Sequence, residues 1–292
     1  HRAGRLSDAI NDYMRVVKLS PMSADVYNNL GVALRATGKA EAAVACYRRA
    51  IAINPEAAGA YTNLGNALRD MGDPARAVEA HRRAVKYAPK SPKALFNAAI
   101  ALRAVGQTKA ALDHLIRAIK IEPTYAMARL EHALTLLAMS DWARGFKEFE
   151  MRFALPGRDP RRADIPTWNG SPLSGQTVLL NYEGNEGTAI QFSRFAQALK
   201  HMNAKVVMEC PSHLTHLMSS MTDIDATVNP GATLDGLDIT VQVPLLSLPT
   251  RLGTSVDNLP AETAYMSAPK FGGQTLTVHP ETRLAVGLVW SG

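Results

Sequence analysis

Cysteine, aromatic residues and long apolar runs are all scarce in this 292-residue sequence. The two cysteines, Cys46 and Cys210, lie far apart, so they supply neither a disulfide framework nor a cluster of thiol ligands for a metal. This use of cysteine is typical of a reducing compartment, and we expect a cytoplasmic protein. No apolar run is long enough to cross a bilayer, so we expect no membrane span. The composition, 47% hydrophobic and 20% charged, is typical of a globular protein.

Positive charge is concentrated in the first half of the chain. Residues 1–155 contain 23 Lys and Arg against 14 Asp and Glu, whereas residues 156–292 contain 9 against 12. The basic residues are scattered along expected helices, without the interleaved aromatic residues that stack on bases. We therefore expect solvated helix faces and no nucleic-acid site.

A 34-residue repeat organises the first half. The segments 26–55, 60–89 and 94–123 align without a gap. Each segment ends at a proline, which cannot continue a helix, and a glycine lies near the middle of each, where a left-handed turn between two helices suits glycine. These residues are Pro55, Pro89 and Pro123, with Pro21 one period earlier, and Gly38, Gly72 and Gly106. Residues 1–21 therefore correspond to the second helix of an earlier repeat.

This pattern resembles the tetratricopeptide (TPR) family. Small residues recur where two helices must approach closely, at Gly31, Gly65 and Ala99 and at Ala43, Ala77 and Ala111. The resemblance implies an α-solenoid over residues 1–155, a right-handed superhelix of about four to five helical hairpins with the first one partial. A decayed last repeat is expected from about residue 126 to 153.

An asparagine row at the same spacing predicts a binding groove. Asn29, Asn63 and Asn97 occupy a position that faces the concave groove in TPR superhelices, and the row resembles the asparagine ladder of the eukaryotic O-GlcNAc transferase. An asparagine amide both donates and accepts a hydrogen bond, which matches one peptide unit. We predict that this row, with Asn66, binds a protein or peptide partner. Asparagine is also common here in TPR sequences, so repeat ancestry is the alternative explanation.

An arginine row lies further along the same helices. It consists of Arg35, Arg69 and Arg103, again 34 residues apart. Guanidinium groups pair with carboxylates in a bidentate way, so we include these three residues in the predicted peptide-binding groove.

The second half has a different pattern. Residues 156–176 are rich in proline, glycine and arginine and are predicted to be a linker. From residue 177, short apolar runs at 177–182, 205–210, about 226–228 and 238–243 alternate with helical stretches. This alternation predicts an open, mainly parallel α/β sheet, with ligands beyond the carboxyl ends of its strands, where the loop 183–187 lies.

Five segments of the chain together resemble bacterial TPR-repeat glycosyltransferases. They are FKEFEMRF, PTWNG, LLNYEGNEGTAIQFSRF, VPLLSLPTRLGT and VGLVWSG, in this order. The catalytic part of that family is similar to heptosyltransferases and has the two-domain GT-B architecture. The resemblance implies that residues 177–282 form the Rossmann-like first half of GT-B and that residues 283–292 begin the donor-binding domain. It implies a nucleotide-sugar donor for a longer protein, with no cofactor held by this chain and no sugar transfer by this chain alone.

One loop departs from that family. The family's loop usually reads Glu-Gln-Gly-Leu-Gly-Asp, and its aspartate is the proposed base. Glu183 and Gly187 match, but Thr188 stands at the aspartate position. A hydroxyl does not take up a proton near neutral pH as a carboxylate does, so Glu186 is the other candidate for the catalytic residue.

The helix after this loop supplies two further candidates. Gln191 and Arg194 match the family, and the resemblance implies that they bind an acceptor or phosphate together with Glu183 and Gly187. For Arg194, an exposed helix arginine without a ligand is an equal alternative. The alternative function for the whole chain is a non-catalytic TPR scaffold with a degenerate glycosyltransferase-like part, so the sequence leaves the enzyme assignment open.

Two other groups were weighed and set aside. His213 and His216 share a helix face, but no cysteine or carboxylate nearby in the sequence completes a ligand set, so we predict no metal site. The aromatic residues at helical spacing between 142 and 153 are expected to seal the end of the solenoid. They are Trp142, Phe146, Phe149 and Phe153.

Overall fold

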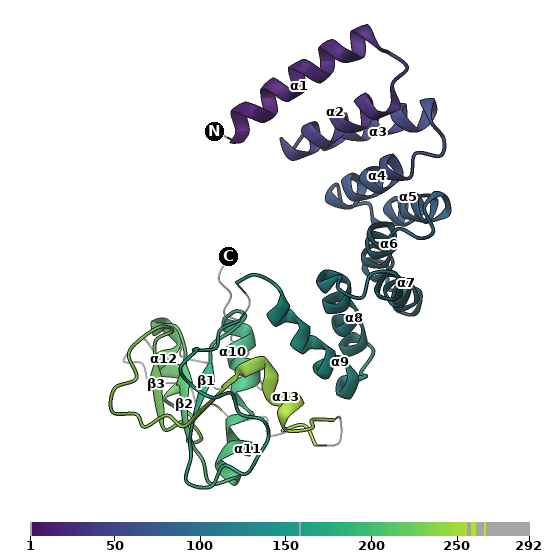
Figure 1. Ribbon diagram of the computed structural model, residues 1–292. Coiled ribbons are helices and arrows are strands. Elements are labelled where there is room, and N and C mark those ends of the chain that lie inside the picture. The colour runs from purple at the N-terminus through teal and green to yellow at the C-terminus, as the bar shows by residue number, and fades with distance from the viewer. Residues whose placement is uncertain (1, 158, 256–257, 261–265, 267–292) are drawn as a thin grey trace, which may run out of the picture.

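The computed structural model describes residues 2–157, 159–255, 258–260 and 266. It consists of a curved stack of helices followed by a unit built on a small parallel sheet, as Figure 1 shows. The expected start of a donor-binding domain at residues 283–292 lies outside the described residues.

The first unit is the expected TPR-type solenoid. After the single helix α1 (Arg2–Leu19), the chain forms helical hairpins α2/α3, α4/α5, α6/α7 and α8/α9. Their bounds are α2 Ala24–Ala36, α3 Ala40–Ile53, α4 Ala58–Asp70, α5 Pro74–Tyr87, α6 Pro92–Ala104, α7 Thr108–Ile121, α8 Ala126–Ala138 and α9 Trp142–Phe149. Gly38, Gly72 and Gly106 join the two helices of the first three hairpins with φ of 78°, 78° and 75°, as expected for left-handed turns.

The first helices of the hairpins form the inner wall of the curve. Helices α2, α4, α6 and α8 each contact the next one in this series, and they lie on the concave side in Figure 1. Their partners α3, α5 and α7 lie on the outer side, whereas α9 lies between α8 and the second unit. Residues that recur every 34 positions on the first helices therefore form rows along the solenoid, and the rows whose side chains face the concave side line the groove.

Each hairpin is closed by a small residue facing a larger one. A Cβ added at Gly31 would lie 2.5 Å from the Tyr47 ring, and one added at Gly65 would lie 2.5 Å from the imidazole of His81. Tyr47 and His81 are both fully buried and are 34 residues apart. The two glycines are therefore needed so that the helices can approach closely.

The second unit is built on four parallel strands in the order β3-β2-β1-β4. The strands are β1 Thr177–Asn181, β2 Lys205–Glu209, β3 Ala226–Val228 and β4 Val241–Pro244. Short helices cover the sheet, namely α10 Glu186–Ser193, α11 Ala196–His201, α12 Ser212–Met218 and α13 Leu248–Arg251, with the 3-10 turns η1 Glu150–Ala154 and η2 Leu245–Ser247. The parallel sheet was expected from the sequence, and the buried apolar strands explain its stability.

Two local expectations were wrong. The last strand begins at Val241 and not at residue 238, because Asp238 has a φ of 44°, which is not strand conformation. The helix expected after the loop 183–187 is divided into α10 and α11 around Arg194 and Phe195.

The segment 156–176, which composition predicts to be a linker, packs closely against the sheet. Trp168 is only 1% exposed and belongs to the core of the second unit. The Trp168 backbone N–H donates to Gln242 in β4 at 2.8 Å. The Gln242 side chain in turn donates to the backbone oxygens of Arg162 and Ile165. This segment is therefore ordered and pairs through its backbone with the edge strand β4.

Among the described residues, no helix combines the length and the apolar character that crossing a membrane requires.

Candidate functional site

The asparagine row on the inner wall consists of three residues in three different environments. Asn29 is exposed and Asn63 is half-buried. The Asn63 side-chain N–H donates to the Asn28 side-chain oxygen at 2.9 Å, which links α4 to α2. Asn97 is 8% exposed, and its side-chain N–H donates to the backbone oxygen of Lys93 in its own helix at 2.7 Å. The row is therefore open to a partner at Asn29 and Asn63 and largely closed at Asn97.

A hollow of about 250 Å³ lies beside Asn63 on this wall. Its polar lining comes from α4 and α6 and from the turn before α6, through Thr62, Asn63, Ser91 and Lys93. Asn66, one turn after Thr62, is half-buried, and its side-chain oxygen has no hydrogen-bond partner among the described residues. A hollow lined by an amide, two hydroxyls and an ammonium group is suited to a peptide backbone with an acidic side chain.

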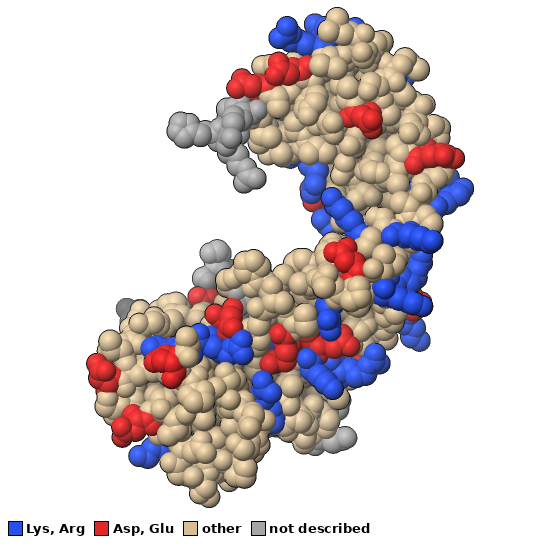
Figure 2. Space-filling model, in the orientation of Figure 1, with Lys and Arg blue, Asp and Glu red and all other residues tan. Residues whose placement is uncertain are grey.

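The arginine row already holds carboxylates of the chain itself at two of its three positions. Arg35 pairs with Asp70 of the next hairpin at 2.6 Å, and Arg103 pairs with Glu131 of α8 at 2.9 Å. Arg69 has no ion-pair partner within the described part of the chain. Figure 2 shows Lys and Arg side chains along the inner edge of the curve as well as on its outer side. Arg69 and Lys93 are thus the cations of the wall most open to an external carboxylate.

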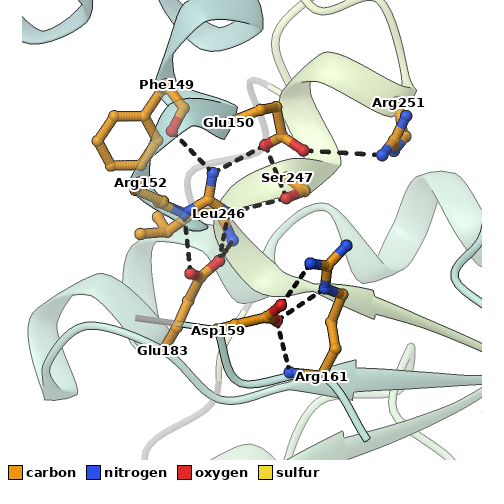
Figure 3. Close-up of polar contacts among 9 residues, drawn as sticks. All are labelled: Phe149, Glu150, Arg152, Asp159, Arg161, Glu183, Leu246, Ser247 and Arg251. Atoms are coloured by element: carbon orange, nitrogen blue, oxygen red, sulfur yellow. Dashed lines mark hydrogen bonds and ion pairs between the residues drawn. The ribbon is translucent and has the colours of Figure 1, made fainter. Parts of the chain in front are cut away.

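An arginine from the end of the solenoid binds the loop after β1. Arg152, in η1, is 4% exposed, and its Nε and Nη2 donate to the two Glu183 oxygens at 3.0 and 2.9 Å, as Figure 3 shows. Its Nη2 also donates to the Ser247 hydroxyl at 2.8 Å, and its Nη1 donates to Glu150 at 2.8 Å. Glu183 additionally accepts a hydrogen bond from the Leu246 backbone N–H at 2.7 Å.

This cluster lies where the strand order reverses. Strands β2 and β3 lie on one side of β1 and β4 on the other, and in open parallel sheets the crevice beyond the ends of such strands is the usual ligand site. Glu183 follows β1 and Ser247 follows β4, so Arg152 fills that crevice from the solenoid side. Because both Glu183 oxygens are bound within the chain, the acceptor-binding role expected for Glu183 requires this ion pair to open.

The rest of the loop is organised by a helix cap. The Asn185 side-chain oxygen accepts hydrogen bonds from the Thr188 backbone N–H at 2.9 Å and from the Thr188 hydroxyl at 3.0 Å. Thr188 therefore completes the start of α10. Glu186 is exposed in the first turn of α10 and lies 3.4 Å from the exposed His213. A Cβ added at Gly187 would lie 3.5 Å from the Asn185 side-chain oxygen, which is ordinary van der Waals contact. Of the two catalytic candidates, Glu186 alone has a carboxylate and access to solvent.

Gln191 and Arg194 border a hollow between the two units. The hollow has a volume of about 310 Å³ and lies between α8, α9 and α10. The Arg194 Nη1 donates to the Pro260 backbone oxygen at 3.3 Å. The other lining residues are apolar, namely Leu137, Trp142, Phe146, Phe192, Phe195 and Leu259. Trp142 and Phe146, two of the four aromatic residues expected to seal the solenoid, therefore face the second unit, with Phe146 against Phe192 at 6.3 Å between ring centres.

A second polar region lies at the carboxyl edge of β2. Arg162 pairs with Glu209 at 2.7 Å, and this pair borders a hollow of about 360 Å³ together with Tyr182. Burial raises the pKa of Tyr182 above its ordinary value, so its hydroxyl stays protonated at neutral pH. No cluster of three or more His, Cys, Asp or Glu side chains is placed to hold a metal in the part of the chain that the structure describes.

Sequence reasoning missed three residues that matter here. Arg152 and Ser247 fill the crevice between β1 and β4, and only the fold brings them together. Leu137 was in principle detectable, because it stands 34 residues after Arg103 and so occupies the fourth position of the arginine row.

Known proteins resemble the helical part of the chain. Residues 1–36 and 32–72 match a family model described as TPR repeat, and residues 62–126 match one described as tetratricopeptide repeat. Residues 1–126 are thus TPR repeats. No curated protein matches the sequence.

Solved TPR structures are similar to about half of the chain. A structure described as "Crystal structure of MamA" is 21% identical, with 51% of this chain and 86% of that chain covered and a TM-score of 0.47. YrrB, described as "a TPR protein with an unusual peptide-binding site", is 21% identical, with 48% and 72% covered and a TM-score of 0.44. The first TPR of Spaghetti (RPAP3), bound to the HSP90 peptide SRMEEVD, is 23% identical, with 40% and 93% covered and a TM-score of 0.39.

Proposed function

We propose that the TPR repeats of this chain bind an extended peptide segment of a partner protein along their inner wall. The observation that carries the proposal is the pair of accessible amides at Asn29 and Asn63, at equivalent repeat positions, with Asn63 in the lining of the hollow that Thr62 and Lys93 also border. Amides at equivalent positions of successive hairpins match the repeating donor and acceptor groups of an extended backbone. Backbone recognition of this kind depends little on the partner's side chains.

The bound segment is expected to be acidic. The solenoid half carries an excess of Lys and Arg over Asp and Glu, and Arg69 and Lys93 have no carboxylate partner among the described residues. An acidic residue near Asn63 would pair with these cations by charge-assisted hydrogen bonds. Binding should then weaken as salt concentration rises.

The proposal is tested with a displayed library of random peptides selected on the whole chain. Wild-type protein should enrich acidic peptides, and the double variant Asn29→Ala/Asn63→Ala should bind the enriched peptides at least about tenfold more weakly, the loss expected when central contacts of an interface are removed. The matched control is Asn97→Ala, because the Asn97 amide is bonded to its own helix. Equal binding by the double variant and the wild type would refute the proposal.

A glycosyltransferase-like role is the second candidate, for the second unit. It is supported by the strand order β3-β2-β1-β4, with the Glu183–Gly187 region at the carboxyl end of β1, which suits the Rossmann-like first half of a GT-B enzyme. In this role the unit provides the acceptor side of the cleft, Glu186 is the base in place of Thr188, and a nucleotide sugar is the donor in a longer protein. A photo-crosslinking amino acid at the exposed Gly187, where an added Cβ would make only an ordinary contact with Asn185, should then capture the solenoid-bound peptide. Failure to capture it would reject this role and leave the scaffold function.

A further inference from the structure

We infer that the hollow between the solenoid and the sheet unit binds one large apolar side chain of the peptide held on the inner wall. The inference rests on the proposed peptide binding and specifies its partner: an extended acidic segment that carries an aromatic or large aliphatic residue. The hollow has a volume of about 310 Å³ and is lined mainly by aromatic and leucine side chains. Pockets of this kind hold the aromatic anchors that dominate many interfaces.

The inner wall changes from polar to apolar as it approaches the hollow. One row at 34-residue spacing reads Thr62 in α4, Phe96 in α6 and Leu130 in α8, and all members are on the first helices. Phe96 and Leu130 are half-buried, so part of each side chain faces solvent. This row therefore changes from a buried polar side chain at α4, whose hydroxyl donates to the Ala58 backbone oxygen, to partly exposed apolar surface at α6 and α8.

A neighbouring row shows the same change. From α4 onward it reads Asn66, Ile100 and Leu134, of which Ile100 and Leu134 are again half-buried, whereas its member in α2 is the exposed Val32. From α4 to α6 and α8, both rows therefore change from a polar side chain to an apolar one. Covering this apolar surface with an apolar partner is favourable by about 25 cal/mol of free energy for each Å² removed from water.

The arginine row leads directly into the hollow. Leu137 follows Arg35, Arg69 and Arg103 at the same spacing and is one of the residues that line the hollow. A Cβ added at Gly145 would lie 2.7 Å from Leu137, so α9 packs directly against Leu137 and holds it in place. The hollow is therefore the end of the inner wall, and a peptide that follows the wall from α2 to α8 reaches it.

The shape of the hollow fits a side chain better than a polar ligand. Trp142, Phe146 and Phe192 border it and are half-buried, so part of each side chain remains exposed. Rings in these positions pack against another ring in stacked or edge-on geometry. Gln191 is exposed at the rim, where its amide is available to the peptide backbone that carries the bound side chain.

The test uses the same displayed library with a variant that fills the hollow. Because Gln191 is exposed at the rim, Gln191→Trp should fold normally, which circular dichroism checks, and should occupy the hollow. The matched control is Lys147→Trp, which adds the same side chain at an exposed position of α9 that does not line the hollow. Both variants are compared with the wild type on peptides enriched by the wild type and on the same peptides with their apolar residue changed to alanine.

Wild-type protein should enrich peptides with one large apolar residue at a fixed distance from acidic residues. Gln191→Trp should bind them about 10- to 100-fold more weakly, the loss typical of a buried aromatic anchor, and should no longer distinguish them from the alanine peptides. Lys147→Trp should keep the distinction. Two results would overturn this inference while peptide binding stands. The first is that the enriched peptides share no position for a large apolar residue. The second is that Gln191→Trp still distinguishes the enriched peptides from their alanine versions as the wild type does. Failure of the wild type to enrich any peptide would overturn both.

Discussion

Arg152 and Glu183 form a bidentate ion pair, with nitrogen–oxygen distances of 3.0 and 2.9 Å, between the last turn of the solenoid and the loop after β1. Both groups are nearly buried, with side-chain exposures of 4% and 8%. The Arg152 guanidinium also lies 4.0 Å from the centre of the Phe153 ring. A buried guanidinium with this many partners fixes the two units to each other, so the end of the inner wall and the sheet form one continuous surface.

Replacing Arg152 with alanine should destabilise the protein strongly. Removal of one member of a buried ion pair leaves the other charge uncompensated, and here the buried Glu183 would lose its main partner at a cost of about 3–5 kcal/mol. Chemical denaturation measures the loss. The matched control is Arg144→Ala, since Arg144 pairs with Asp141 on an exposed surface and its loss should cost only about 0–1 kcal/mol. Similar losses in the two variants would contradict the structural role of Arg152.

Burial of His81 should make the stability of the solenoid depend on pH. The imidazole is fully buried, and burial lowers the pKa of His81 from 6.5 to about 4, with a smaller contribution from the Arg69 charge. Above pH 6.5 both the folded and the unfolded histidine are neutral, so there is no effect. As pH falls from 6.5 to 4, only the unfolded state takes up the proton, and roughly 3 kcal/mol of stability is lost.

The variant His81→Tyr checks this prediction, because Tyr47 occupies the equivalent position beside a glycine one repeat earlier. Unfolding free energies of wild type and variant are compared at pH 7 and pH 4. The variant should lose less stability on acidification than the wild type, by roughly 3 kcal/mol. The same pH dependence in both proteins would show that His81 is not the group responsible.

Gly65 should not tolerate a side chain. A Cβ at this position would lie 2.5 Å from the His81 ring, so Gly65→Ala forces α4 and α5 apart and should cost about 1–3 kcal/mol. Gly59, in the same helix, has open space at the Cβ position. Gly59→Ala should therefore be neutral or stabilise by up to about 1 kcal/mol through its better helix propensity. Thermal unfolding of the two variants distinguishes these outcomes, and equal effects would contradict the packing described.

Much of the fold was predictable because it depends on local periodicity. The 34-residue spacing of Pro55, Pro89 and Pro123 predicts the hairpins, and the apolar run at Thr177–Asn181 predicts a buried parallel strand. The composition of residues 156–176 was misleading, because proline and glycine are as compatible with an ordered, packed segment as with a linker. Only tertiary contacts around Trp168 distinguish the two.

The site was less predictable than the fold. Repeat spacing placed Asn29, Asn63 and Asn97 in one row, but it did not show that the Asn97 amide bonds to its own helix. Similarly, the loop motif identified Glu183, but Arg152 is distant in sequence and only the packing of the two units brings them together. Contacts between distant segments decide which polar groups remain available, and these contacts leave no spacing signal in the sequence.

The most direct test of peptide binding by the inner wall is the affinity of three proteins for one library-selected acidic peptide, measured by isothermal titration calorimetry. We predict that Asn29→Ala/Asn63→Ala binds at least about tenfold more weakly than the wild type, whereas Asn97→Ala binds as the wild type does. Undiminished binding by Asn29→Ala/Asn63→Ala, in a protein with an unchanged helical spectrum, would contradict the account.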